Sequence, residues 1–202
     1  MFLNLSFDFS LIIFFNFYLI LSHMSDIDIK INEYKRLIKI EPTNAWHHFH
    51  LGEALEEKGK LNEAIEEYSK AVELDPTFPD FHFKKAEVLL KLSKFQEALQ
   101  VYDNAIRKDP KNAHLYHYFK GEIYEKLGKY EEALKEYNRA IEWSPNNSWY
   151  RQAKIYLLEK MNKLEDALKE VEELIKIDSS AVNLELKNEI LVKLKNNNDI
   201  KV

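Results

Sequence analysis

Residues 121–145 of the chain read GEIYEKLGKYEEALKEYNRAIEWSP, and this stretch decides the fold. Its final proline belongs to a series, because Pro42, Pro76, Pro110 and Pro145 are spaced 34, 34 and 35 residues apart. Three further series keep the same register: Ala64, Ala98, Ala133 and Ala167; Tyr34, Tyr68, Tyr102 and Tyr137, with Val171 in the last place; and Ala71, Ala105 and Ala140, followed by Leu174. Four residue series in one register indicate a tandem array of a single structural unit.

Within each repeat the spacing of apolar residues is helical. In the first repeat it predicts one helix at about 45–58 and a second at about 61–74. Residues suited to capping a helix N-terminus stand before three of the predicted first helices; they are Asn44, Asn112 and Asn147. Each repeat is therefore expected to be a pair of helices.

All four glycines of the chain fall at repeat positions. Gly52 and Gly121 lie on first helices, where the missing Cβ permits close approach of the partner helix. In the turn between the two helices, a residue in the left-handed conformation ends the first helix at low energetic cost. This position is occupied in successive repeats by Gly59, Ser93, Gly128 and Asn162. The scarcity of glycine thus reflects a helical chain with few turns.

The repeat resembles the tetratricopeptide repeat family, whose 34-residue pattern combines a bulky residue, Leu-Gly, aromatic residues, two alanines and a proline. The matching residues are His48, Leu51, Gly52, Leu55, Ala64, Tyr68, Ala71 and Pro76 in one repeat and Gly121, Tyr124, Ala133, Tyr137, Ala140 and Pro145 in another. The intervening repeat has Ala86 for Gly, and the last one has Ile155, Leu174 and Ser179 for Gly, Ala and Pro. The resemblance implies an all-α fold, an α-solenoid of antiparallel helix pairs forming a right-handed superhelix.

We predict that the repeat array covers residues 26–195 and is followed by a tail at 196–202. The array is divided into a partial leading unit at 26–42, repeats at 44–77, 78–111 and 113–146, a degenerate repeat at 147–180, and a capping helix at 181–195. The capping helix is expected to shield the last apolar face of the array.

Residues 1–23 form a hydrophobic N-terminal segment that contains six of the twelve Phe, one acidic residue and no Lys or Arg. Its apolar run at 11–21 is shorter than the about 20 residues that cross a bilayer. Two interpretations remain open. The segment is a weak membrane anchor that leaves the repeats on the cytoplasmic side, or it is a spurious extension and Met24 is the true start.

The composition excludes several classes of function. A net charge of −5 argues against nucleic-acid binding, and the absence of Cys removes thiolate metal sites and cysteine nucleophiles. No phosphate-binding loop or hydrolase motif is present, so we expect neither enzymatic activity nor a cofactor. His47 and His50 have a spacing that could bring two imidazoles to one metal, but no third ligand is evident and we expect no metal site.

The face of each first helix that turns away from its Leu/Gly packing face is the candidate binding surface. In the resembled family these faces line a groove that holds partner peptides. The predicted groove residues are Trp46, Phe49, Glu53, Glu56, Phe83, Glu87, Leu90, Leu115, Tyr118, Glu122, Trp149 and Tyr156. Aromatic side chains offer rigid contact area and carboxylates favour basic partners. The alternative is that part of this aromatic stripe packs between adjacent repeats.

The sequence therefore predicts a non-catalytic, cytoplasmic scaffold that binds an apolar and basic segment of a partner protein. The alternative is a membrane-tethered assembly factor or adaptor anchored through residues 1–23. Residues after Met24 are almost all used by repeats, which leaves no room for a catalytic domain. The identity of the partner and the oligomeric state do not follow from the sequence.

Overall fold

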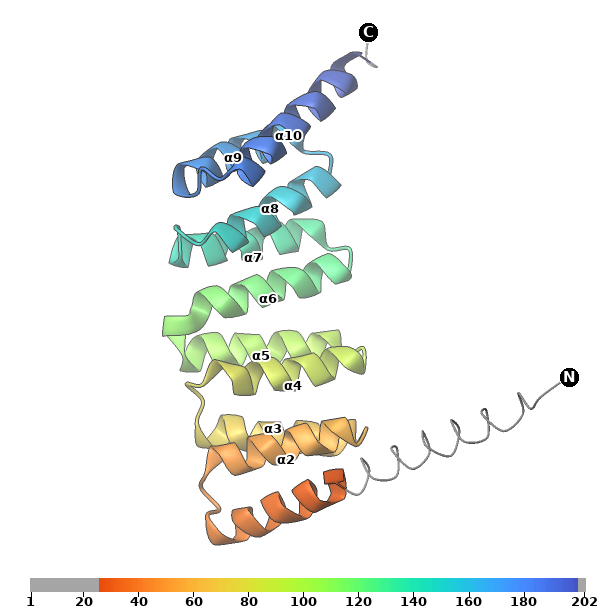
Figure 1. Cartoon of the computed structure of the whole chain (residues 1–202), viewed down its shortest axis with the longest axis vertical. Helices are drawn as coiled ribbons and strands as arrows, with labels where there is room; N and C mark the ends of the chain where they lie inside the picture. Colours follow the sequence, from red (N-terminus) through yellow and green to blue (C-terminus); the bar gives the residue numbers. More distant parts are fainter. Residues whose placement is uncertain (1–25, 200–202) are drawn as a thin grey trace, which may run out of the picture. The chain divides into compact units, whose positions relative to one another are not determined.

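The computed structural model describes residues 26–199, and this part of the chain is helical with short connections (Figure 1). Residues 1–25 and 200–202 lie outside the described part, and with them the predictions for the N-terminal segment and the end of the tail. The chain divides into two compact units, one ending at Lys94 and the other beginning at Phe95. The division falls within the predicted repeat 78–111, between its two helices, and each unit is described by itself.

The first unit contains helical residues 26–40 followed by α2 (Ala45–Glu57), α3 (Leu61–Leu74) and α4 (Pro79–Lys91) (Figure 1). The bounds of α2 and α3 agree with the helices predicted at 45–58 and 61–74. These two helices pack against each other as an antiparallel pair, and α3 in turn packs against α4.

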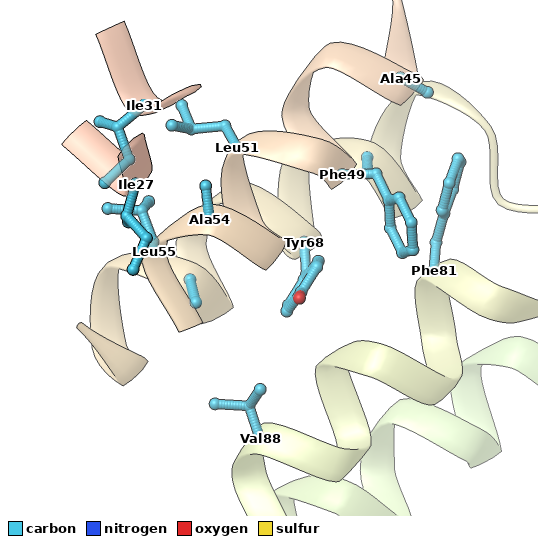
Figure 2. Packing of buried hydrophobic residues seen from close by; sticks show 12 residues of the cluster. Ile27, Ile31, Ala45, Phe49, Leu51, Ala54, Leu55, Tyr68, Phe81 and Val88 are labelled. Atoms are coloured by element: carbon cyan, nitrogen blue, oxygen red, sulfur yellow. The ribbon is translucent and has the colours of Figure 1, made fainter. Parts of the chain in front are cut away.

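The core of the first unit is built from residues of successive helices (Figure 2). Ile27 and Ile31 from the first helical segment are buried in the same cluster as Leu51 and Leu55 of α2. Phe81 of α4 belongs to this cluster as well. The helices of this unit therefore bury side chains in one shared cluster, which is how stacked repeats obtain a continuous core.

The second unit contains α5 (Phe95–Lys108), a short 3₁₀ helix η1 (Pro110–Asn112), α6 (Ala113–Lys126), α7 (Tyr130–Trp143), α8 (Ser148–Lys160), α9 (Leu164–Ile177) and α10 (Ala181–Asp199). The helices α6 and α7 form one pair and α8 and α9 another, and α10 packs on α9. The all-α fold built from antiparallel helix pairs is thus confirmed.

The turns between paired helices adopt the left-handed conformation that the sequence predicts. The backbone angle φ is +80° at Gly59, 58° at Ser93, +70° at Gly128 and 55° at Asn162. Ser93 and Asn162 reach this region without the freedom of glycine, so the turn geometry is imposed by the helix pair and not by the residue alone.

Close approach at the predicted glycines is also confirmed. A Cβ on Gly52 would lie 2.6 Å from a ring carbon of Tyr68, and one on Gly121 would lie 2.4 Å from the equivalent carbon of Tyr137. In the degenerate repeat, Ile155 and Val171 replace this glycine and tyrosine, and both are buried in one cluster. A larger residue on the first helix is thus accompanied by a smaller one on the second.

Two of the three predicted N-caps form. The side chain of Asn44 accepts a hydrogen bond from the backbone N–H of Trp46 at 3.1 Å, and Asn147 accepts one from Trp149 at 3.0 Å. Asn112 occupies the predicted N-cap position of α6, but its side chain accepts no cap hydrogen bond, and its amide instead donates to Oδ2 of Asp109 at 2.7 Å. The 3₁₀ turn leaves Asn112 outside the extended conformation that a cap residue usually adopts.

The last helix differs from the predicted capping helix in two ways. It extends to Asp199, four residues beyond the predicted end at 195, so the first part of the predicted tail is helical. It shields part of the apolar face of α9, because Ile190 is buried in a cluster with Leu174. Its other side is not polar throughout, since Val182 and Val192 are largely exposed.

Among residues 26–199, no helix combines the length and the apolar character that a membrane span requires.

Candidate partner-binding surface

The predicted surface begins in the first unit with Trp46, which the Asn44 cap holds at the start of α2. Its indole is 43% exposed, yet the other side of the ring packs edge-on against Phe78 and Phe81, at centroid distances of 4.7 and 5.1 Å. Trp46 therefore connects α2 to the next repeat and offers a partner only part of its surface.

Phe49 is 6% exposed and lies within the core, so its assignment to the binding groove is corrected. Its ring packs against Phe81 at 5.1 Å and against Tyr68 at 5.6 Å. The alternative interpretation, in which the aromatic stripe packs between repeats, describes this residue. Phe83 and Leu90, also predicted in the groove, are half-buried on α4.

The predicted carboxylates of the first unit already have partners within the chain. Glu53 lies 2.8 Å from Nδ1 of His50, and Glu56 lies 2.5 Å from the ammonium of Lys91. Burial would raise the pKa of Glu87, but hydrogen bonds from Lys91 and Lys84 outweigh it and lower this pKa. Lys91 and Lys84 thus compensate Glu56 and Glu87 within the chain, whereas the contact of Glu53 is a hydrogen bond with a histidine.

In the second unit the structure brings four predicted residues together around one pocket of about 450 Å³. Tyr118 and Glu122 line it from α6, and Trp149 and Tyr156 line it from α8. The indole of Trp149 is 73% exposed and the phenol of Tyr156 is 64% exposed. Leu115, the remaining predicted residue on α6, is half-buried and does not line this pocket.

Tyr118 connects the aromatic wall of this pocket to its carboxylate. Its hydroxyl donates a hydrogen bond to Oε1 of Glu122 at 2.9 Å. Its ring packs against Tyr150 and Tyr137, at centroid distances of 5.3 and 5.8 Å, which fixes its position. Burial, followed by the charge of Glu122 and the hydrogen bond to it, raises the pKa of Tyr118 above its ordinary value. The carboxylate of Glu122 is therefore held in place by a neutral phenol.

A second pocket of about 450 Å³ adjoins the first and lies between α8 and α10. Tyr156 and Gln152 line both pockets, and Val182 and Leu186 of α10 line the second. Tyr156 thus stands between two depressions, so the surface along α6, α8 and α10 is uneven and partly apolar.

Sequence reasoning missed a recurring contact that joins neighbouring repeats. Tyr137 donates its hydroxyl to Glu125 at 3.1 Å, and Glu125 also lies 3.1 Å from the ammonium of Lys160. The same arrangement occurs in the first unit, where Tyr68 donates to Glu56 at 2.8 Å beside Lys91. Its signal in the sequence is a Glu followed by a Lys 35 residues later. Glu56 is thereby corrected from a groove residue to a contact between repeats.

Two histidines at equivalent repeat positions, His48 and His117, contact carboxylates. Within their own helix pairs, Nδ1 of His48 lies 2.7 Å from Glu67 and Nδ1 of His117 lies 2.6 Å from Glu136. In the degenerate repeat the equivalent pair is Arg151 and Glu170, with 3.0 Å between nitrogen and oxygen. The partners stand 19 residues apart in each case.

His47 and His50 contact different carboxylates. Nε2 of His47 lies 2.9 Å from Glu41, whereas Nδ1 of His50 bonds to Glu53. Across residues 26–199, no group of three or more His, Cys, Asp or Glu side chains is arranged to hold a metal ion.

Helix pairs of nearly constant length, joined by left-handed turns, define a helical-repeat protein, and two of the pairs pack through a glycine–tyrosine contact. Three family models match the chain: a TPR repeat model at residues 54–93 and two tetratricopeptide repeat models at residues 33–66 and 83–148. The chain belongs to the tetratricopeptide repeat family. This repeat fold is that of protein–protein interaction scaffolds.

Solved structures show the same fold. A crystal structure of MamA protein is 23% identical, covers 78% of this chain and 86% of its own, and has a TM-score of 0.61. YrrB, described as a TPR protein with an unusual peptide-binding site, is 20% identical over 86% of this chain and 89% of its own, with a TM-score of 0.58. A thermophilic TPR protein in Thermus thermophilus is 19% identical over 86% and 95% of the two chains, with a TM-score of 0.56. No curated protein sequence matches the chain.

Proposed function

We propose that this protein is a non-catalytic interaction module that binds a segment of a partner protein on the outward face of its first helices. The observation that carries the proposal is the pocket between α6 and α8, where Trp149 and Tyr156 remain mostly exposed. Exposed aromatic side chains grouped around a depression are typical of binding surfaces, because they bury a large area with few rotatable bonds. YrrB, which shares the fold, is a TPR protein with a peptide-binding site.

The two units contribute differently to this proposal. In the first unit the aromatic side chains contact one another, and Glu56 and Glu87 have lysine partners, so we expect this unit to supply mainly structure and the exposed part of Trp46. The binding energy is expected to come from the second unit. A truncation of Trp46 is a poor test, because it would also remove the contacts with Phe78 and Phe81.

The test is partner capture by the full chain, with the bound proteins identified by mass spectrometry. Truncation of Trp149 and Tyr156 to Ala should weaken capture of the same partners while the helical circular dichroism stays unchanged. Trp143 is a matched control, because its indole is 57% exposed on α7 and lies outside the pocket. If Trp143→Ala lowers capture as much as Trp149→Ala, or if neither variant lowers it, the assignment of the binding surface to this pocket is wrong.

A further inference from the structure

The pocket between α6 and α8 has one carboxylate, Glu122, that forms no ion pair with a cation of the described residues. We infer that this pocket, here named the Glu122 pocket, takes the guanidinium group of an arginine side chain in the partner segment. The inference rests on the proposed function and specifies the chemistry that the partner must present.

The electrostatics of the lining single out Glu122. The other carboxylate of the pocket, Glu125, is compensated by Lys160 at 3.1 Å. Within residues 26–199, the only hydrogen bond that the Glu122 side chain accepts comes from the neutral hydroxyl of Tyr118. Lys126 also lines the pocket, one turn further along α6, but it forms no ion pair with Glu122 among the described residues. Glu122 is therefore the carboxylate of this pocket that has no ion pair within residues 26–199 and is available to a cation of the partner.

The aromatic rings around Glu122 suit a planar cation. Trp149 and Tyr156 are seven residues apart on one helix, so their Cα atoms are separated by about 10 Å along the axis. Ala153 lies between them and lines the pocket, and its small side chain leaves room between the two rings. A cation placed against an aromatic face is attracted by the electron density of the ring.

Arginine fits this arrangement better than lysine. Its guanidinium is flat, stacks on aromatic faces, is more weakly hydrated than an ammonium, and matches a carboxylate through two parallel hydrogen bonds. The hydrogen bond from Tyr118 orients the Glu122 carboxylate before a ligand arrives, which reduces the ordering that binding requires. The aliphatic stem of arginine would lie against the exposed indole of Trp149.

The test uses the full chain and four blocked tripeptides: acetyl-Leu-Arg-Leu-amide and its analogues with lysine, citrulline or glutamate in the central place. Citrulline has nearly the shape of arginine and no charge. Binding is followed through the indole N–H resonances of the three tryptophans, of which Trp149 reports on the pocket and Trp143 on a surface outside it. Substitution of each tryptophan by Phe assigns the resonances.

The arginine peptide is expected to shift the Trp149 resonance and to bind about tenfold or more tightly than the citrulline peptide. Glu122→Gln keeps an acceptor for the Tyr118 hydroxyl but removes the charge, so it should abolish the preference for arginine over citrulline. Glu132→Gln, which removes an exposed charge on α7, should leave the preference intact.

The inference would be overturned if the citrulline or the lysine peptide bound as tightly as the arginine peptide. It would also be overturned if only the Trp46 or Trp143 resonance shifted, or if no peptide shifted any resonance. These results are separate from the outcome of partner capture. A captured partner that depends on Trp149 and not on arginine would leave the proposed function standing and remove the arginine site alone. Arginine-dependent peptide binding without any captured partner would remove the proposed function and leave the arginine site standing.

Discussion

The imidazole Nδ1 of His117 lies 2.6 Å from Oε2 of Glu136, and both side chains are buried between α6 and α7. The second oxygen of Glu136 lies 2.9 Å from Arg139 and 3.4 Å from Lys120. Lys120 is itself buried and lies 2.7 Å from Asp103 of α5. Three consecutive helices of the second unit are thus joined by a cluster of charges, in addition to their apolar contacts.

Acidification should weaken the second unit through this cluster. Burial alone would raise the pKa of Glu136, but the hydrogen bond with His117 and the charges of Lys120 and Arg139 outweigh it and lower this pKa below its ordinary value of 4.5. Because the pKa is lower in the folded state, the ionised carboxylate stabilises the fold above the ordinary value, and this contribution is lost as the pH falls through the folded pKa. The free energy of unfolding by urea should therefore fall as the pH drops below about 4.5.

The variant Glu136→Gln should be less stable at neutral pH by about 1–3 kcal/mol, because the buried Lys120 and His117 lose a charged hydrogen-bond acceptor, although Lys120 keeps Asp103. Its stability should also depend less on pH below about pH 5 than that of the unmodified chain. Glu132→Gln on the exposed face of α7 provides the control and should reproduce the original pH dependence. Identical acid profiles for the Glu136 variant and the unmodified chain would contradict this role.

Gly121→Ala should destabilise the protein by about 1–3 kcal/mol, since the new methyl group would meet the buried ring of Tyr137. The same substitution should cost less in a Tyr137→Val background, where the ring is absent. That background imitates the combination of Ile155 and Val171 in the degenerate repeat. Thermal and urea unfolding of the two single variants and the double variant measure the coupling, and additive losses would show that the contact is not the cause.

The left-handed turns give a pair of opposite expectations. Gly128→Ala should destabilise by about 1 kcal/mol, because φ is +70° there and a Cβ is strained in that region. Ser93→Gly should stabilise by up to about 1 kcal/mol, because the serine holds φ at 58°. Urea midpoints of the two variants check both signs, and a loss of stability in Ser93→Gly would mean that the turn does not strain the serine.

Asn147→Ala should lower stability by about 1 kcal/mol through the loss of the cap on α8. Since the capped N–H belongs to Trp149, the substitution should also change the environment of that indole, which its fluorescence or its N–H resonance would report. Asn146→Ala, one residue earlier and exposed, is the control and should leave both unchanged. A stability loss without any change at Trp149 would separate the cap from the positioning of the binding surface.

The repeat residues were sufficient to predict much of the fold. The spacing of Pro, Ala, Tyr and Gly predicts the helix pairs, because each residue type suits one local feature. Pro and Gly suit turns, Ala and Gly permit close approach of helices, and Tyr supplies a buried ring. The bounds of α2 and α3, the left-handed turns and the caps at Asn44 and Asn147 follow from such local requirements. The side chain of Asn112 does not form the predicted cap hydrogen bond. It lies at the end of a 3₁₀ turn that begins at Pro110, and its amide bonds to Asp109 instead.

The candidate site was predictable only in part. Helical periodicity places Trp46, Phe49 and Trp149 on equivalent faces, yet Phe49 is buried, Trp46 is half-covered and Trp149 is mostly exposed. The difference comes from neighbours that the repeat pattern does not specify, such as Phe78 and Phe81 beside Trp46. Likewise, Lys91 is the ionic partner of both Glu56 and Glu87. It lies one repeat after Glu56 and one helical turn after Glu87.

The sequence alone therefore determined the helices, the repeat register and which face of each first helix turns outward, since these depend on periodicity and on residues close in the chain. Only the tertiary structure decided which of the outward side chains stay available to a partner. Availability depends on the exposure and charge compensation created by residues about one repeat away, as between Glu125 and Lys160, whereas Glu122 has no such cation within residues 26–199. The tertiary packing thus brings four predicted groove residues, Tyr118, Glu122, Trp149 and Tyr156, together at the pocket between α6 and α8, where we propose that a partner binds.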